Sequence, residues 1–457
     1  MPQPPAPLCR RSALLTDLYE LTMAAAYFES GFEDAEASFE LFVRALPRNR
    51  NYLLLAGIEQ ALSYLEWLRF EPDEIEYLRA QPVFAHISPA FFDRLRSLRF
   101  TGDVWAIAEG TPVFSGEPLL RVTAPFIEAQ IVETALLSNL SVQTAIASKA
   151  ARVVDAAQGR KVVEFGSRRA HGPAAAVLAA RAAFIGGCCG TSNVESGFEF
   201  GIPVYGTLAH SFVMAHEDEV ESFRTMERLF PGNSVLLVDT YDTLAAVDKI
   251  IAAGLRPDGV RLDSGNFVEL AKQVRSRLDA AGLRDTRIFI SGDMNEERIA
   301  GLLAQGTPVD FFGVGTELAT SKDAPALSAV YKLVEFTRDG RRHMVEKLSP
   351  GKANYPGRKQ VFRVRHADGF CARDVVACED ERCDGEPLLR EVMRRGKRVA
   401  GPESVQQAQA RAAEEIRRLP REVRQLQAGS RYEVKVSARL RALAAKTKRE
   451  RLHRSAM

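Results

Sequence analysis

The sequence is poor in cysteine, in long apolar runs and in net charge. Six cysteines in 457 residues are too few for a disulfide-built scaffold of this size. Uninterrupted apolar runs of about eighteen residues do not occur, so we expect no membrane-spanning helix. The formal net charge of +2 gives no overall field that would favour nucleic acid or a membrane surface. The first residues lack the apolar stretch of a signal peptide, so we expect a cytoplasmic protein.

The cysteines also lack the spacing of a zinc site. Cys371, Cys378 and Cys383 lie close together, but they include no C-x-x-C pair, no fourth thiol and no suitably spaced histidine. We interpret them as structural or incidental cysteines. Cys188 and Cys189 stand in a Gly-Gly-Cys-Cys-Gly segment, where small residues favour close backbone packing.

The chain has the composition of a globular protein, with 46% hydrophobic and 26% charged residues. Its length allows two or three packed units. Three zones differ in pattern: residues 1–125 mix helices with short strands, residues 126–335 alternate strands and helices, and residues 336–457 return to short strands followed by helices. In the first zone, Asp17 and Glu20 have the spacing of a capping box at the start of a helix.

The middle zone predicts an α/β barrel. Short apolar runs without polar alternation alternate with helical patterns, and we expect strands at 162–165, 204–205, 235–238, 259–262, 288–290 and 311–312. Such runs are typical of a parallel sheet that is covered on both faces. About six strand–helix units in succession favour a barrel.

The end of the chain is basic, with 19 Lys and Arg residues against seven Asp and Glu residues from 390 to 457. Such an excess is found in RNA-binding tails, but also on the solvated face of packed helices. Apolar residues are interspersed throughout, as in Arg439-Leu440-Arg441-Ala442-Leu443. We favour the packed helix.

A small, polar cluster follows nearly every predicted strand of the middle zone. These clusters are Gly166-Ser167-Arg168-Arg169, Gly206-Thr207 to His210-Ser211, Asp239-Thr240-Tyr241-Asp242, Arg261-Leu262-Asp263-Ser264-Gly265, Ser291-Gly292-Asp293 and Gly313-Val314-Gly315-Thr316. One such cluster could be a helix cap. Six of them converge on the carboxyl-end face of a parallel barrel, where barrel enzymes hold their active sites.

The residue types in these clusters suit a phosphorylated sugar and a small planar acid. Gly292 and the segment Gly313-Val314-Gly315-Thr316 let backbone N–H groups approach an anion. The guanidinium groups of Arg168, Arg169 and Arg261 suit phosphate or carboxylate.

Carboxylates and one aromatic ring extend this interpretation. Asp263 and Asp293 can accept ribose hydroxyls or reach Mg²⁺, directly or through water. Phe165 can stack a flat ring, but a strand aromatic of the core explains it equally well. His210, taken alone, is more often a structural or capping histidine.

Taken together, the clusters resemble nicotinate phosphoribosyltransferases. The motifs that carry the resemblance are Thr16-Asp17-Leu18-Tyr19, Glu164-Phe165-Gly166-Ser167-Arg168-Arg169-Ala170, Gly206-Thr207-Leu208-Ala209-His210-Ser211-Phe212, Val238-Asp239-Thr240-Tyr241-Asp242, Val260-Arg261-Leu262-Asp263-Ser264-Gly265 and Phe312-Gly313-Val314-Gly315-Thr316. They occur in the family's order, and the resemblance extends from about residue 12 to about residue 440.

The resemblance implies a fold, a reaction and a shared site. The expected fold is α/β, an irregular TIM-like barrel plus an α/β sandwich domain built from both chain ends. The expected reaction joins nicotinate to 5-phosphoribosyl 1-diphosphate, giving nicotinate mononucleotide and diphosphate for NAD salvage, with ATP as co-substrate and Mg²⁺ required. Members are commonly homodimers, in which Tyr19 would reach the neighbouring site and stack nicotinate opposite Phe165.

The resemblance also implies a role for each site residue. His210 would be the phosphorylated histidine, oriented by Asp239. Nicotinate would be bound by Tyr19, Phe165, Arg168, Ser192 and Arg261. The phosphoribose and its phosphates would be bound by Arg168, Arg261, Asp263, Gly292, Asp293, Gly313, Gly315 and Thr316.

Ser192 bears on the choice between acid and amide. Related nicotinamide enzymes carry an aspartate at about this position, which would accept a bond from the amide and repel a carboxylate. The neutral Ser192 therefore favours nicotinate. Two departures from the family pattern are Ser167, between Gly166 and the arginines, and Asn266, where many members have an acid.

Three alternatives stay open. A nicotinamide or quinolinate phosphoribosyltransferase is the nearest, although quinolinate enzymes are shorter and lack the Ala-His-Ser-Phe motif. A catalytically silent, ligand-sensing homologue is disfavoured by the joint presence of His210, Asp239, Arg261 and Asp263. An RNA-associated protein would depend on the basic end of the chain.

Overall fold

The computed structural model describes residues 12–33, 35–348, 354–427, 429 and 431–455, so Cys9 lies outside the described residues. The chain forms two compact units. Residues 1–145 and 326–457 make one, which we call the sandwich unit. Residues 146–325 make the other, which we call the barrel unit. Helix α6 (Glu133–Ala156) begins in the first and ends in the second.

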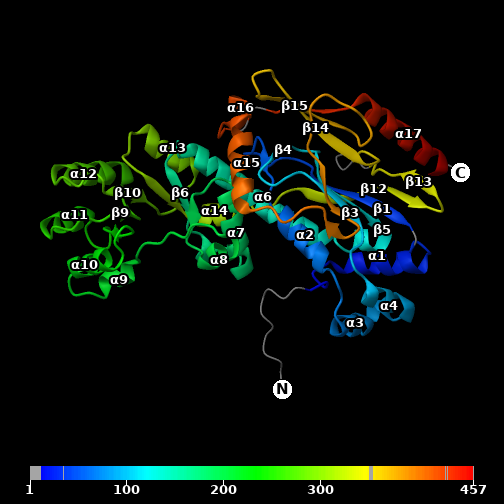
Figure 1. Ribbon diagram of the computed structural model, residues 1–457, viewed down its shortest axis with the longest axis horizontal. Helices are drawn as coiled ribbons and strands as arrows, with labels where there is room; N and C mark the ends of the chain where they lie inside the picture. The colour runs from blue at the N-terminus through cyan, green and yellow to red at the C-terminus, as the bar shows by residue number, and fades with distance from the viewer. Residues whose placement is uncertain (1–11, 34, 349–353, 428, 430, 456–457) are drawn as a thin grey trace. The chain divides into compact units, whose positions relative to one another are not determined.

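The main sheet of the sandwich unit is assembled from segments far apart in the sequence. Strand β1 (Glu36–Val43) pairs antiparallel with β5 (Pro118–Pro125) on one side and with β12 (Ala329–Arg338) on the other. Figure 1 shows the blue β1 beside the yellow β12. The seven-stranded order is β13-β12-β1-β5-β3-β17-β18. The expected α/β sandwich built from both chain ends is therefore confirmed.

Smaller sheets and helices complete this unit. A four-stranded sheet has the order β16-β14-β15-β19, and β2 pairs with β4. The remaining strands are β2 (Leu53–Leu54), β3 (Asp103–Ala106), β4 (Pro112–Val113), β13 (Arg341–Met344), β14 (Lys359–Arg365), β15 (Cys371–Cys378), β16 (Glu386–Pro387), β17 (Arg390–Arg394), β18 (Lys397–Arg398) and β19 (Val434–Val436). The helices are α1 (Leu18–Glu29), α2 (Ile58–Trp67), α3 (Pro72–Arg79), the 3-10 turn η1 (Pro82–Phe84), α4 (Pro89–Ser97), α5 (Phe126–Gln130), α15 (Val405–Arg417), α16 (Arg421–Arg424) and α17 (Ala438–Ser455).

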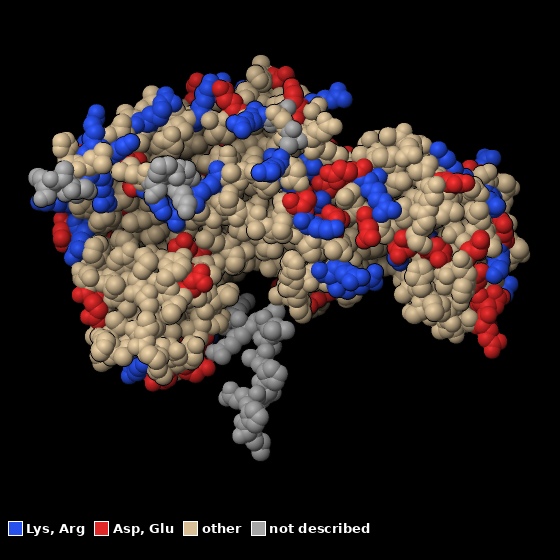
Figure 2. Space-filling view, turned by 180° about the vertical axis from the view of Figure 1, so that it is seen from behind, with Lys and Arg blue, Asp and Glu red and all other residues tan. Residues whose placement is uncertain are grey.

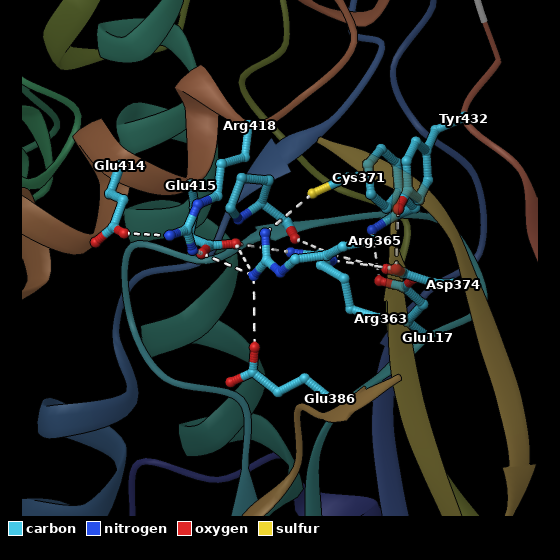
Figure 3. Close-up of polar contacts among 12 residues, drawn as sticks. Glu117, Arg363, Arg365, Cys371, Asp374, Glu386, Glu414, Glu415, Arg418 and Tyr432 are labelled. Carbon is cyan, nitrogen blue, oxygen red and sulfur yellow. Dashed lines mark hydrogen bonds and ion pairs between the residues drawn. The ribbon is translucent and has the colours of Figure 1, made fainter. Parts of the chain in front are cut away.

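An ionic network lies buried between these elements (Figure 3). Arg363 and Asp374 are both 0% exposed, and two guanidinium nitrogens donate to the two carboxylate oxygens at 3.1 and 2.7 Å. The Tyr432 hydroxyl donates to Asp374 at 3.0 Å, and Arg365 donates to both oxygens of Glu415 at 2.9 and 3.1 Å. Pairing of this kind offsets the large cost of removing charges from water.

The network also contains a carboxyl group whose pKa is raised. Glu117 is fully buried, and burial raises its pKa well above the ordinary value. The negative charge of Asp374 raises it further, while Arg363 opposes the shift. Its Oε2 accepts a hydrogen bond from the backbone N–H of Phe114 at 2.8 Å.

The basic end of the chain packs onto the sandwich unit as helices. Leu440 of α17 is 0% exposed and belongs to the hydrophobic core, while Arg439 faces outward and pairs with Asp380 at 2.6 Å. Acidic and basic residues intermingle over the face shown in Figure 2. The expected packed helix with a solvated basic face is confirmed. Within the described residues, no helix has the length and apolar character to cross a membrane.

The barrel unit contains a six-stranded parallel sheet in the order β7-β6-β11-β10-β9-β8. Its strands are β6 (Lys161–Glu164), β7 (Gly190–Thr191), β8 (Val235–Leu237), β9 (Gly259–Leu262), β10 (Arg287–Ile290) and β11 (Phe311–Val314). Its helices are η2 (Ser167–Arg169, a 3-10 turn), α7 (Pro173–Ile185), α8 (Val194–Phe200), α9 (His210–Met214), α10 (Glu219–Leu229), α11 (Thr243–Ala252), α12 (Phe267–Ala280), α13 (Glu296–Ala304) and α14 (Thr316–Ala319). The predicted alternation of strands and helices is confirmed, with helices flanking the strands in Figure 1.

One predicted strand is wrong. Residues 204–205 make only an isolated bridge, from Val204 to Thr191, and the strand at this place in the sheet is β7. Strand β7 could not be predicted, because a two-residue strand of glycine and threonine has no apolar pattern.

Polar side chains cap the N-termini of helices in the barrel unit. The side chains of Asp242, Asn266 and Asn295 accept hydrogen bonds from backbone N–H groups at the starts of α11, α12 and α13. Asn266, a departure from the family pattern, therefore has a local structural role. In the sandwich unit, Asp17 and Glu20 form the predicted capping box at the start of α1.

Candidate functional site

The polar clusters meet at one edge of the barrel unit. Because β6 and β8–β11 are parallel, the segments that follow them lie at the same carboxyl-end edge. Each segment carries residues that the sequence had singled out. The predicted residues at this edge are Phe165, Arg168, Ser192, His210, Asp239, Arg261, Asp263, Gly292, Asp293, Gly313, Gly315 and Thr316.

Arg261 of β9 is the centre of this edge. Its Nε donates to Ser291 Oγ at 2.8 Å, one terminal nitrogen donates to Thr207 Oγ1 at 2.7 Å, and the other donates to Asp263 Oδ1 at 2.7 Å. The guanidinium thus joins the segment around Thr207 to the segments that follow β9 and β10. Its side chain is 13% exposed, so one edge of the group still reaches solvent.

Asp263 is held as a carboxylate. Burial alone would raise its pKa, but hydrogen bonds from Ser291 and Arg261 outweigh burial, and the pKa is lowered. The charge of His210 lowers it further, which places the imidazole within electrostatic range of this carboxylate. Asp239 accepts hydrogen bonds from Asp263 N at 3.1 Å and from Ser264 Oγ at 2.6 Å.

His210 begins helix α9 and is half-buried. Its Nδ1 lies 3.1 Å from Thr240 Oγ1, so a hydrogen bond joins the ring to a hydroxyl. The expected partner, Asp239, is the residue before Thr240. Its Oδ2 is used by the Asp263–Ser264 turn, and its Oδ1 is buried without a hydrogen bond. The orienting role of Asp239 stays a prediction.

Phe165 lies against the glycine-rich segment after β11. A Cβ on Gly313 would come within 2.6 Å of the Phe165 ring, so only glycine leaves room for the ring there. The Arg261 guanidinium lies over the same ring, 6.0 Å from its centre. Phe165 is half-buried, so its ring is partly open to a ligand.

The two glycine-containing segments have the backbone geometry of anion-binding turns. Gly292 has φ +94°, and a Cβ there would lie 2.1 Å from the carbonyl oxygen of Asp263. Asp293 also adopts positive φ, at +49°. Gly315 precedes α14, whose first residue is Thr316. Backbone N–H groups in turns of this kind suit phosphate oxygens.

Arg168 and Ser192 flank the site on the β6 and β7 side. Arg168 is exposed in the turn η2, and Ser192 is half-buried directly after β7. Asn193 donates to Ser167 Oγ at 3.1 Å and so ties the two segments together. Ser167, a departure from the family pattern, therefore helps to hold the segment that carries Ser192.

Tyr19 belongs to α1 of the sandwich unit and is 45% exposed. Burial raises the pKa of its hydroxyl, and the charges of Glu133 and Glu20 raise it further. The phenol therefore stays neutral at physiological pH. A neutral, partly exposed ring is suited to stacking on a planar ligand.

The carboxylates of the edge fit Mg²⁺ that is shared with a substrate. Among the described residues, no three His, Cys, Asp or Glu side chains are grouped as a complete metal site. Mg²⁺ commonly uses one or two carboxylates together with substrate phosphates and water. The unpaired Asp239 Oδ1, beside Asp263, offers oxygen ligands of this type.

Sequence reasoning missed three side chains of the edge. Thr207 and Ser291 bind the Arg261 guanidinium, and Thr240 contacts His210. All three stood within the polar clusters, but nothing in a one-dimensional pattern tells a hydroxyl that contacts a site residue from one that caps a turn.

Family models match most of the chain. Residues 14–141 match the nicotinate phosphoribosyltransferase (NAPRTase) N-terminal domain, and residues 382–444 match the nicotinate phosphoribosyltransferase C-terminal domain. Residues 146–325, which are those of the barrel unit, match the quinolinate phosphoribosyl transferase C-terminal domain. The barrel model therefore describes a fold common to both enzyme groups, and the flanking models distinguish between them.

Individual relatives match over nearly the full length. A nicotinate phosphoribosyltransferase of Mycobacterium tuberculosis is 46% identical over 436 residues, which cover 94% of this chain and 92% of that protein. The Bacillus subtilis enzyme of the same name is 42% identical over 83% of this chain and 78% of its own length. The crystal structure of human nicotinic acid phosphoribosyltransferase superposes with a TM-score of 0.83 at 29% identity, covering 94% of this chain and 99% of that one.

Proposed function

The chain belongs to the nicotinate phosphoribosyltransferase family, and from this premise we propose that it joins nicotinate to 5-phosphoribosyl 1-diphosphate. The products would be nicotinate mononucleotide and diphosphate, in the salvage of nicotinate to NAD. The observation that carries the proposal is the Arg261 guanidinium, which draws Thr207, Asp263 and Ser291 together at the strand ends.

The proposed reaction needs positioning and charge more than a protein nucleophile. The nicotinate ring nitrogen forms a bond to the anomeric carbon while the bond from that carbon to the diphosphate oxygen breaks. Positive charge develops on the ribose and negative charge on the leaving group. Arg261 and Arg168 would bind the acidic groups, and Asp263 would accept hydrogen bonds from ribose hydroxyls.

His210 is our candidate for coupling ATP hydrolysis to this transfer. A ring nitrogen would attack the γ-phosphorus of ATP, release ADP and hold the phosphoryl group until water removes it as phosphate. The Thr240 contact fixes one ring nitrogen and thereby the orientation of the imidazole. Asp239, directly before Thr240, would stabilise the positive charge of the phosphorylated ring.

Mg²⁺ would be held by Asp239 or Asp263, with Asp293 as a further carboxylate of the same edge. When bound, it would neutralise phosphate charge. The backbone N–H of Asp263 donates to Asp239 Oδ2 at this edge, and Asp239 Oδ1 makes no hydrogen bond.

A homodimer with shared sites would bring Tyr19 to the ligand. Helix α1 and the segment before it expose Leu15 (57%), Leu18 (54%), Tyr19 (45%) and Met23 (36%), an apolar surface suited to a second copy of the chain. In such a dimer, the Tyr19 ring would stack nicotinate against Phe165 of the partner. We place the enzyme in the cytoplasm.

The substrate is best tested by steady-state turnover with nicotinate, nicotinamide and quinolinate. We expect nicotinate to be used at least about 100-fold more efficiently than either rival. Ser192 is neutral where a nicotinamide enzyme would carry an aspartate, and quinolinate needs further basic residues for its second carboxylate. Preference for nicotinamide or quinolinate would overturn the proposal, and absence of turnover with all three would favour a silent homologue.

The phosphoryl step is tested with labelled ATP. Incubation with γ-labelled ATP should give an acid-labile label on the wild type and none on His210→Ala. Label that persists in the variant would place the phosphorylated residue elsewhere. Salt-dependent RNA binding that is lost on truncation at residue 390 would instead support the RNA-associated alternative.

A further inference from the structure

A buried lysine of the barrel unit has no part in the chemistry described above. Lys149 lies on α6 and is 1% exposed, so its ammonium cannot touch a substrate. Three carboxylates surround it. Nζ lies 2.5 Å from Glu296 Oε2, 3.0 Å from Asp323 Oδ1 and 3.6 Å from Glu317 Oε2.

The cluster favours the charged form of Glu296. Burial alone would raise the pKa of Glu296, but the charge and hydrogen bond of Lys149 outweigh it, with help from Arg152, and the pKa is lowered. Arg152 Nε donates to Glu296 Oε1 at 2.9 Å. Buried ion clusters are seldom more stable than apolar packing of the same volume. Stability alone therefore does not explain this cluster, and the segments that carry its carboxylates matter.

Two of these carboxylates directly follow the candidate anion-binding segments. Glu296 is the first residue of α13, after the turn that contains Gly292 and Asp293. Glu317 is the second residue of α14, after the segment from Gly313 to Thr316. One ammonium therefore links the ends of two segments that follow neighbouring strands, β10 and β11.

We propose that Lys149 is a positioning residue that sets the spacing between these two segments, and so determines affinity for the sugar phosphate. This proposal rests on the proposed function, because it takes 5-phosphoribosyl 1-diphosphate as the ligand. Lys149 acts through Glu296 and Glu317 and contacts no ligand.

Loss of the ammonium would leave carboxylates facing one another without their shared counter-ion. Glu317 and Asp323 would move apart or toward solvent, because like charges repel strongly in a buried setting. A shift of about 1 Å in a binding segment is enough to cost a large factor in binding or rate. The nicotinate contacts of Arg168 and Ser192, on the β6 and β7 side, would be spared.

The test is calorimetric titration of the full chain with 5-phosphoribosyl 1-diphosphate and Mg²⁺, combined with steady-state kinetics. Lys149→Met removes the charge at similar length, and Lys149→Arg keeps it. We expect Lys149→Met to bind at least tenfold more weakly and to raise the KM for the sugar phosphate at least tenfold, with the KM for nicotinate unchanged within about twofold. Lys149→Arg should recover most of the affinity.

Two further variants separate positioning from folding. Glu317→Gln removes a carboxylate that is 15% exposed, so it should fold and weaken binding about threefold. Lys249→Met breaks a different ion pair with a buried glutamate, Glu219, at 2.6 Å, and should leave affinity within about twofold.

The outcomes are distinct. Unchanged affinity in both Lys149→Met and Glu317→Gln, or an equal loss for both substrates, would overturn the positioning role. A wild type that binds the sugar phosphate but forms no nicotinate mononucleotide would overturn the proposed function alone, because the titration does not depend on turnover. A wild type that does not bind it would overturn both.

Discussion

The Thr240 hydroxyl, and not the carboxylate of the residue before it, lies against the ring of His210, with Oγ1 3.1 Å from Nδ1. Asp239 Oδ2 accepts hydrogen bonds from Asp263 N and Ser264 Oγ, and Asp239 Oδ1 makes no hydrogen bond. In the proposed phosphoryl transfer, Thr240 would therefore orient the imidazole and Asp239 would supply negative charge.

Thr240→Val should slow phosphoryl transfer from ATP. The variant keeps the shape of the side chain but cannot hydrogen-bond to Nδ1, and a bond worth about 1 kcal/mol corresponds to roughly a fivefold lower rate. Single-turnover transfer of label from ATP measures this directly. Thr240→Ser keeps the hydroxyl and should stay within about twofold of the wild type. An equal loss in both variants would contradict the role of the hydroxyl.

Gly292→Ala should destabilise the protein and weaken binding of the sugar phosphate. The new Cβ would lie 2.1 Å from the Asp263 carbonyl oxygen, at a φ of +94° that an alanine rarely adopts. Strain of this kind costs on the order of 1–3 kcal/mol, measurable by urea denaturation.

Gly301→Ala is the matched control. Gly301 lies within α13, and a Cβ there would meet nothing within 4 Å. Replacing a helical glycine by alanine should stabilise the protein by roughly 0.5–1 kcal/mol. If both variants lose stability equally, the close approach at Gly292 is not the cause.

Ser192→Asp should reduce the use of nicotinate. A carboxylate placed beside the substrate carboxylate adds like-charge repulsion, and we expect the KM for nicotinate to rise at least about tenfold. The KM for 5-phosphoribosyl 1-diphosphate should change little. Ser192→Ala, which adds no charge, is the control and should change either KM by less than about threefold. A comparable effect of Ala and Asp would mean that repulsion is not what selects the acid.

Glu117→Gln should change how stability depends on pH. The folded pKa of Glu117 lies above the ordinary value of 4.5, so the folded chain keeps a proton that the unfolded chain releases as pH rises. The stabilising contribution of Glu117 is therefore fully present below pH 4.5, and it is progressively lost as the pH rises toward the folded pKa.

Glutamine does not titrate, so the variant lacks this loss. The free energy of unfolding of Glu117→Gln, minus that of the wild type, should therefore be larger at pH 8 than at pH 5. Guanidinium denaturation at both pH values gives the comparison. A relative stability that stays the same between pH 5 and pH 8 would show that Glu117 is already ionised in the folded protein.

Local pattern was enough to predict much of the barrel unit and its site. Short apolar strands such as β9 and β10 are distinctive because both faces of a parallel sheet are covered, and the cap at Asp17 follows from spacing alone. The convergence of Arg261 and Ser291, which belong to different strand ends, followed from the single rule that parallel strands end at one edge.

What could not be predicted depends on side-chain direction and on long-range pairing. Lys149 stands in a helical pattern where a lysine usually reaches solvent, and nothing local marks it as buried. The choice between Asp239 and Thr240 as the partner of His210 depends on which of two adjacent side chains faces the ring. Strand β7 is too short and too polar to have a pattern.

The pairing of β1 with β12 has a consequence for the newly made chain. Val43 pairs with Ala329, so roughly 300 residues must be translated before β1 has its second neighbour, about 15–60 s at typical synthesis rates of about 5–20 residues per second. During that interval one edge of β1 is open while the strands of the barrel unit emerge in sequence beside their own partners. Premature termination after residue 325 would therefore release a chain with an unpaired edge strand, which is a template for aggregation and a target for chaperones and proteases.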